Sequence, residues 1–217
     1  MFFRRKIHNL LHPKLGKILM LHSISSPKDL ESLVGTCRSE GFEPISLDEA
    51  VIRLLSGSKN RFSCFTFDDG YKDTYTISLP TLIRLNVPFC VYMTRDFYRG
   101  FSKPAWAPSS PMMTVEQMMD MGQHPLCTIG VHTCSHPHLS RLGKMEQKRE
   151  IANCKSDLES ILGKRIFHLA YPHGDYNHDT LEIVSELGFV TAVTTSGRHV
   201  RDDSKLLELD RIFVNEQ

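Results

Sequence analysis

Residues 61–70 read Arg-Phe-Ser-Cys-Phe-Thr-Phe-Asp-Asp-Gly, a mostly apolar run that ends in two adjacent carboxylates and a glycine. An apolar run of this length, rich in aromatic residues and closed by a turn signal, predicts a strand. Asp68 and Asp69 follow directly after it. In folds that alternate strands and helices, the carboxyl end of a strand is the usual place for functional side chains.

The same kind of run recurs along the chain. Further strands are expected at 17–21, 88–94, 126–131, 166–171, 189–194 and 207–214. Stretches with helical spacing lie between them, such as Leu30, Leu33, Val34 and Cys37. Seven strands separated by helices predict parallel strands with right-handed crossovers, and hence an α/β protein built as a distorted or incomplete (β/α) barrel. An open doubly wound sheet is the alternative.

Composition narrows the class of protein. The 217 residues are 41% hydrophobic and 24% charged, which suits one globular domain over residues 1–217. The formal net charge is +1, and no run of like charges forms a stripe that could follow a phosphate backbone, so nucleic acid is not an expected partner. The six cysteines form no Cys-x-x-Cys pair and lie mostly in apolar runs, which favours reduced core thiols.

The N-terminal segment Met1–Lys6 is basic, and the apolar stretch at 18–21 is too short for a secretion signal. No stretch approaches the roughly 18 to 20 apolar residues that span a bilayer. We therefore expect a cytoplasmic protein without a transmembrane segment, whose basic N-terminus could touch a membrane surface. The oligomeric state stays open.

Chemically active side chains follow several of the expected strands. His22 follows the first strand, and His132 and His136 follow the strand at 126–131. Pro172, His173 and Gly174 follow the strand at 166–171. Because parallel strands end at one edge of a sheet, these residues are expected to form one site.

Two adjacent buried carboxylates repel one another unless a cation or a shared proton lies between them. His132 and His136 stand four residues apart, a spacing that can bring both rings onto one ion. Two histidines and one carboxylate form a set that suits zinc or another first-row metal, and the second aspartate is then free to act as a base. The alternatives are an exposed Asp-Asp-Gly turn and a nucleophile at Cys134, which lacks any other signature of a reactive thiol.

These motifs resemble the polysaccharide deacetylases, the NodB-homology domain or carbohydrate esterase family 4. The resemblance runs from Ile18 to Val214 and rests on three segments in order: Thr66-Phe67-Asp68-Asp69-Gly70, His132-Thr133-Cys134-Ser135-His136-Pro137 and Ala170-Tyr171-Pro172-His173-Gly174-Asp175-Tyr176. It implies a distorted barrel that hydrolyses N-acetyl groups of amino sugars with one divalent metal. Zinc is the first choice, and cobalt, nickel, manganese and iron are alternatives.

The resemblance also implies roles for individual residues. Asp68 corresponds to the general base, and Asp69, His132 and His136 correspond to the metal ligands. The backbone N–H of His173 corresponds to the oxyanion donor. The opening Leu19-Met20-Leu21-His22-Ser23 is similar to the subgroup that deacetylates poly-N-acetylglucosamine, which makes His22 the candidate general acid.

Two positions depart from the family pattern. Ala170 stands where an arginine often orients the base, and His173 stands where a tyrosine is frequent. We expect Arg211 to supply the missing cation. A non-catalytic carbohydrate-binding relative and a hydrolase of small non-sugar amides remain alternatives to a deacetylase of a polysaccharide, an oligosaccharide or a lipid-linked glycan precursor.

Substrate contacts are expected from aromatic and loop residues near the motifs. Residues 95–111 read as a long loop that could form a substrate rim, and it carries Trp106, the single tryptophan of the chain. Pro172 and Tyr176 belong to the third motif. We expect Trp106, Pro172 and Tyr176 to contact the glycan.

Overall fold

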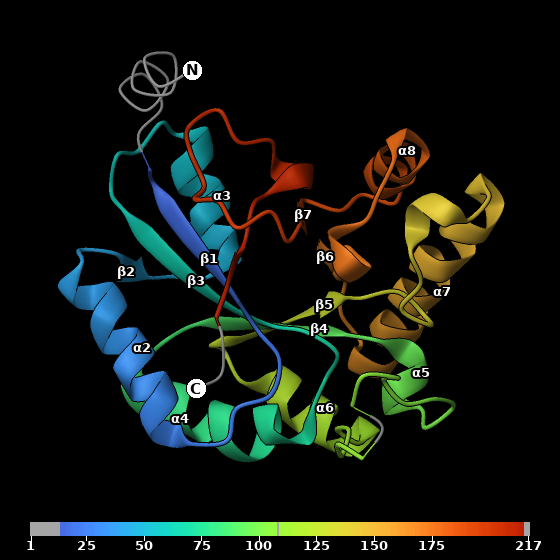
Figure 1. Ribbon diagram of the computed structural model, residues 1–217, viewed down its shortest axis with the longest axis horizontal. Helices are drawn as coiled ribbons and strands as arrows, with labels where there is room; N and C mark the ends of the chain where they lie inside the picture. The colour runs from blue at the N-terminus through green and yellow to red at the C-terminus, as the bar shows by residue number, and fades with distance from the viewer. Residues whose placement is uncertain (1–13, 108, 215–217) are drawn as a thin grey trace.

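The computed structural model describes residues 14–107 and 109–214, and its centre is a curved parallel sheet (Figure 1). In the described part of the chain the strands follow the order β7-β6-β5-β4-β3-β1-β8, and β2 pairs with β3. The strand bounds are β1 Gly16–Leu21, β2 Glu43–Pro44, β3 Phe62–Phe67, β4 Phe89–Met93, β5 Cys127–Val131, β6 His168–Ala170, β7 Thr191–Val193 and β8 Ile212–Phe213. This half-barrel of seven parallel strands confirms the expected distorted (β/α) barrel.

Most helices cover the outer face of the sheet. The helix bounds are α2 Pro27–Ser39, α3 Leu47–Leu55, η1 Thr74–Ser78, α4 Leu79–Leu85, α5 Arg95–Tyr98, α6 Val115–Gln123, η2 Leu139–Arg141, α7 Lys144–Leu162, η3 Pro172–Gly174, α8 His178–Glu186 and η4 Leu206–Glu208. In contrast to the others, α3 packs through Leu47 and Ala50 against the interior cluster that contains Phe62 and Cys64. In Figure 1, α2, α4 and α6 lie along one side of the sheet, and α7 and α8 lie beyond β5 and β6. The connection 74–85 is also helical, although it contains several β-branched residues and Pro80. Pro80 lies in the first turn of α4, directly after η1, a stretch of π-helix that runs into α4 without a break in the helical backbone.

Side chains of the strands alternate between the barrel interior and the helix layer. In β3, Phe62 and Cys64 join the interior cluster, whereas Phe65 and Phe67 join the cluster that packs against the helices. The period of two then directs Thr66 and Asp68 to the interior. The interior is tight, because a Cβ atom on Gly130 would lie 2.4 Å from the ring of Tyr92.

The C-terminal segment closes the half-barrel. A continuous strand over 207–214 was wrong: residues 206–208 form η4, and only Ile212–Phe213 are a strand. The reason is that this segment pairs first with residues at β7 and then with β1. Leu209 bonds to Ala192 and Thr194 beside β7, and Ile212 then pairs with Leu19 in β1.

Other expectations about the chain have mixed outcomes. The predicted loop 95–111 begins with the short helix α5. All six cysteines are free and buried, as expected. Among the described residues, no helix combines the length and the apolar character needed to cross a membrane. The basic segment Met1–Lys6, proposed to touch a membrane, lies outside the described residues.

Candidate active site

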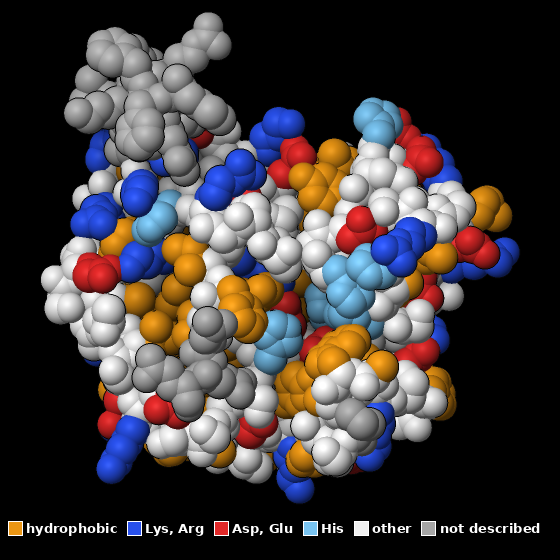
Figure 2. Space-filling model, viewed as in Figure 1, with side chains coloured by type: hydrophobic (Ala, Val, Ile, Leu, Met, Phe, Trp, Pro, Cys, Tyr) orange, Lys and Arg blue, Asp and Glu red, His pale blue; other side chains and the backbone are white. Residues whose placement is uncertain are grey.

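The ends of five strands, β1, β3, β5, β6 and β7, deliver polar side chains to one cavity at the mouth of the half-barrel. The cavity has a volume of about 470 Å³ and is lined by Met20, His22, Asp68, Trp106, His132, His136, His173 and Thr195. Figure 2 shows histidine side chains gathered around a hollow in this face. The sequence prediction that these strand ends meet is therefore correct for His22, Asp68, His132, His136 and His173.

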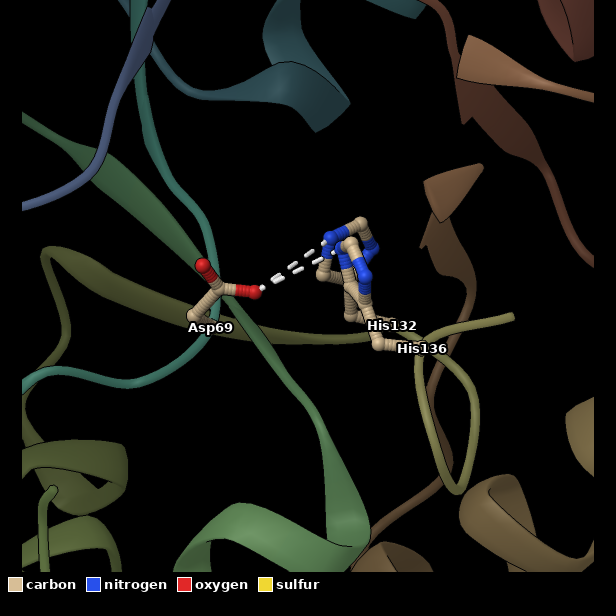
Figure 3. Close-up of side chains that lie close together, drawn as sticks. All are labelled: Asp69, His132 and His136. Carbon is tan, nitrogen blue, oxygen red and sulfur yellow. Dashed lines mark ion pairs between the residues drawn. The ribbon is translucent and has the colours of Figure 1, made fainter. Parts of the chain in front are cut away.

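Asp69, His132 and His136 form a compact cluster beside this cavity (Figure 3). The Nε2 atoms of both histidines lie 3.7 Å from Oδ1 of Asp69. Ligands of one tetrahedral ion at Zn–N distances of 2.0–2.1 Å stand roughly 3 to 4 Å apart, so the spacing fits a single metal ion.

The surroundings of Asp69 also fit a cation. Its side chain is 1% exposed, and among the described residues no donor makes a well-formed hydrogen bond to either carboxylate oxygen. Burial and the neighbouring charge of Asp68 raise the pKa of Asp69 to about 8, although Arg211 and the nearby Tyr71 hydroxyl partly offset this. A buried carboxylate with so few donors is costly, and a bound cation would remove that cost.

Both histidines are electrically neutral, as metal ligands must be. Burial lowers the pKa of His132 to about 4 and that of His136 to about 2. The ring nitrogen Nδ1 of His132 lies 2.8 Å from the carbonyl oxygen of Ala170, so it donates a proton there. Its Nε2 lone pair therefore faces Asp69. The carbonyl that fixes this tautomer belongs to Ala170, the position at which the family often has an arginine.

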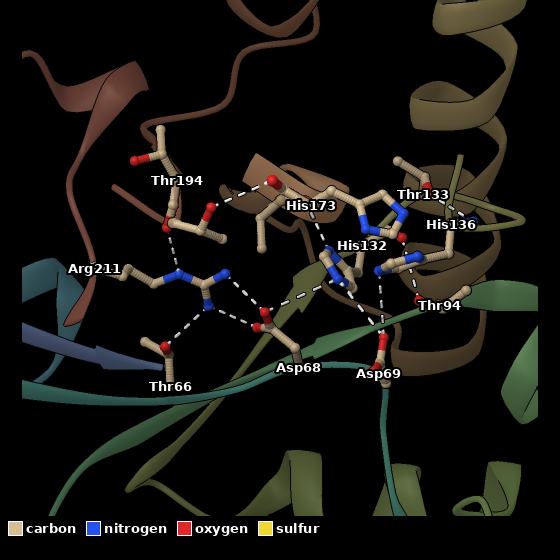
Figure 4. Close-up of polar contacts among 12 residues, drawn as sticks. Thr66, Asp68, Asp69, Thr94, His132, Thr133, His136, His173, Thr194 and Arg211 are labelled. Atoms are coloured by element: carbon tan, nitrogen blue, oxygen red, sulfur yellow. Dashed lines mark hydrogen bonds and ion pairs between the residues drawn. The ribbon is translucent and has the colours of Figure 1, made fainter. Parts of the chain in front are cut away.

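Asp68 is held by Arg211 rather than by the histidines (Figure 4). Nη1 and Nη2 of Arg211 each donate to one carboxylate oxygen of Asp68 at 2.7 Å. Burial alone would raise the pKa of Asp68, but the positive charge of Arg211 and its hydrogen bonds to the carboxylate hold that pKa well below its usual range. Asp68 is thus an ionised carboxylate at the cavity wall at neutral pH.

Arg211 reaches Asp68 because it lies between Leu209, which bonds to residues at β7, and Ile212, which pairs with β1. The side chain of Arg211 is 0% exposed. Nε donates to the carbonyl of Thr194 at 2.9 Å, and Nη1 also donates to Oγ1 of Thr66 at 3.2 Å. Thr66 and Thr194 were missed in the sequence; the signal for Thr66 was its place two residues before Asp68 on the interior face of β3.

The other predicted residues differ in position. Trp106 lines the cavity, is 52% exposed and donates from Nε1 to the Tyr71 hydroxyl at 3.1 Å. Pro172 is buried and is not among the residues that line the cavity. Tyr176 lines a neighbouring cavity of about 430 Å³, where its hydroxyl donates to Glu208.

The mouth of this parallel half-barrel holds an Asp–Arg pair and an Asp-His-His cluster. This combination is typical of barrel hydrolases that bind a metal ion in the active site. Comparison with known proteins gives the family. The polysaccharide deacetylase profile matches residues 57–192. YxkH of Bacillus subtilis, described as a polysaccharide deacetylase, is 30% identical over 207 residues, which cover 91% of this chain and 71% of that protein.

Solved structures agree with this result. The deacetylase PplD of Streptococcus pyogenes, solved with acetate, superposes with a TM-score of 0.77 at 25% identity and covers 91% of each chain. IcaB of Ammonifex degensii has the same fold, with a TM-score of 0.79 at 23% identity over 93% of this chain and 92% of that one. The chain belongs to the polysaccharide deacetylase family. It is accordingly a hydrolase of carbon–nitrogen bonds other than peptide bonds.

Proposed function

We propose that this protein removes the acetyl group from an N-acetylated amino sugar in a glycan, in a metal-dependent reaction. Asp69, His132 and His136 would hold one divalent ion, with zinc the first choice. The observation that carries the proposal is that one site contains two carboxylates in different electrostatic surroundings. Asp68 is ionised and paired with Arg211, whereas Asp69 is buried beside two neutral histidines.

The two aspartates divide the work. A divalent ion, when bound, supplies Lewis-acid polarisation of the amide carbonyl and makes a water molecule more acidic. Asp68 lines the cavity and accepts the proton of the attacking water. The two bonds from Arg211 fix the orientation of the Asp68 carboxylate and keep it deprotonated.

His22 and His173 would act on the other parts of the substrate. Both line the cavity with Asp68. An amide releases a poor leaving group, so the amine must gain a proton as the C–N bond breaks, and we assign the donation of this proton to His22. His173 has φ 59°, in the left-handed region, and its backbone N–H would donate to the oxygen that becomes negative.

The cavity wall suits a sugar ring. Trp106 offers a large, half-exposed ring held in place by its bond to Tyr71. The apolar face of a pyranose can pack against such a ring while its hydroxyl groups stay hydrated. We propose that the substrate is an oligosaccharide, a polysaccharide or a lipid-linked glycan precursor.

The test is acetate release by the metal-loaded enzyme. Oligomers of N-acetylglucosamine, free N-acetylated monosaccharides and N-acetylated nucleotide sugars would be compared, with acetate and new amine measured together. We expect equal amounts of both products from at least one glycan, and strong loss with Asp68→Asn. Release of acetate at the same rate by the Asp68→Asn variant would contradict the proposal.

A further inference from the structure

The loop that carries His136 has a backbone that needs support. Thr133 has φ 66° and His136 has φ 61°. Both values lie in the left-handed region that residues other than glycine rarely adopt, so neighbouring groups must hold the loop in this shape. His136 projects from this loop toward Asp69, and any relaxation of the backbone would move its ring.

One side of the loop is held by backbone bonds from the start of α5. The N–H of Arg95 donates to the carbonyl of Thr133 at 3.1 Å, and the N–H of Asp96 donates to the carbonyl of Cys134 at 2.9 Å. These bonds fix the carbonyl groups of the loop. They leave the N–H groups of Cys134 and Ser135 to find an acceptor elsewhere, whereas the N–H of His136 donates to Oγ1 of Thr133 at 3.1 Å within the loop.

The acceptor is the carboxylate of Glu150 in α7. Its Oε2 accepts from the N–H of Cys134 at 3.0 Å and from the N–H of Ser135 at 2.9 Å. Its Oε1 accepts from the Ser135 hydroxyl at 3.0 Å. Consecutive backbone N–H groups form a concave site for an anion, so a charged carboxylate binds here more strongly than a neutral acceptor.

We propose that Glu150 is a positioning residue that sets the place of the metal ligand His136. This inference rests on the metal site proposed above. Glu150 does not line the reaction cavity; it lies with Ser135 and Arg149 in a separate surface pocket, and it therefore acts through the loop. One of its three bonds goes to Cys134 and two go to Ser135, the residue directly before His136, so they fix the backbone from which that ring projects.

The chain offers a matched control on the same helix. Glu159 also lies in α7, and its carboxylate accepts from a backbone N–H, that of Ile166, at 2.9 Å. Ile166 precedes β6 and carries no part of the proposed metal site. Glu159→Ala therefore removes a bond between helix and loop, together with the ion pair to Lys155 at 3.1 Å, without touching His136.

The experiment measures Zn²⁺ dissociation constants by competition with a chromophoric chelator, together with the visible spectrum of the Co²⁺-loaded protein. Glu150→Ala should weaken Zn²⁺ binding about 10- to 100-fold, the range seen when a group that orients a ligand is removed, and should alter the Co²⁺ spectrum. Glu150→Gln keeps one carbonyl acceptor and should recover most of the affinity. Glu159→Ala should lower stability to urea and leave both metal readouts unchanged.

Two results would overturn the inference, and they are distinguishable. If Glu150→Ala binds Zn²⁺ like the wild type while His136→Ala loses it, the metal site stands and the positioning role is wrong. If the folded wild type binds no Zn²⁺ at Asp69, His132 and His136, the proposed metal site itself is wrong. Circular dichroism on each variant ensures that only folded proteins are compared.

Discussion

Asp69 gives the metal-free protein an unusual dependence of stability on pH. Burial, and then the charge of Asp68, raise the pKa of Asp69 from 3.8 to about 8 in the folded state. Between these values the folded protein keeps a proton that the unfolded chain has released. Its free energy of unfolding therefore falls as pH rises, by up to ~1.4 kcal/mol per pH unit. Over the whole interval this amounts to roughly 6 kcal/mol, an upper bound because water can enter the opened site.

Asp69→Asn removes this effect, since asparagine stays neutral. We expect the metal-free variant to be as stable as the metal-free wild type near pH 4 and several kcal/mol more stable near pH 8. His132 and His136, whose pKa values burial lowers, contribute an opposite slope below pH 6.5. That slope is present in both proteins and cancels in the difference between them.

The assay is urea unfolding at pH 5, 6, 7 and 8 with a chelator present, followed by circular dichroism. A second series with Zn²⁺ should reverse the order at pH 8, because only the wild type gains stability from binding. A difference between the metal-free proteins that stays constant from pH 5 to pH 8 would refute the reasoning.

Three further predictions concern the cavity. Asp68→Asn should retain the metal and lose turnover by about 10²-fold or more, since the proton acceptor is gone; near-normal kcat would exclude the base role. Arg211→Met leaves the Asp68 charge buried and unpaired, so unfolding should become easier by about 3–5 kcal/mol. The pKa of Asp68 should also rise, which moves the acidic limb of the pH–rate profile to higher pH; an unshifted limb in the folded variant would make Arg211 a packing residue. His22→Ala should lose much more kcat on an N-acetyl amide than on an activated acetyl ester, whose leaving group needs no proton, and equal losses would reject the acid role.

The sequence predicted the site because parallel strands end together. The apolar run before Asp68 forms β3 and the run before His132 forms β5. These two strands lie in one sheet with only β4 between them. Their period-two alternation directs Asp68 and His132 toward the same interior, so residues 64 positions apart meet without any long-range information beyond the fold class. The strand cores were predictable for the same reason.

The finer geometry could not be predicted. The residue pattern alone left open which aspartate faces the histidines, and only the family resemblance pointed to Asp69, whose φ of 71° turns its side chain away from the alternation of β3. The apolar residues of the 207–214 segment predicted one strand. In the folded chain Leu209 instead pairs with Val193 of β7 and Ile212 pairs with Leu19 of β1, and these two contacts depend on the closure of the barrel. Nothing in the sequence distinguished Glu150 from the other charged residues on the solvent-exposed face of α7. Tyr176 shares a motif with His173 but lines a different cavity.

The most direct test of the account is a metal titration of chelator-treated enzyme, followed by acetate release from an oligomer of N-acetylglucosamine. We predict no release without metal, a linear return of activity that levels off at one equivalent of Zn²⁺, and no return in the Asp69→Asn variant. Full acetate release by protein shown to be free of metal would contradict the central claim that Asp69, His132 and His136 bind a catalytic ion.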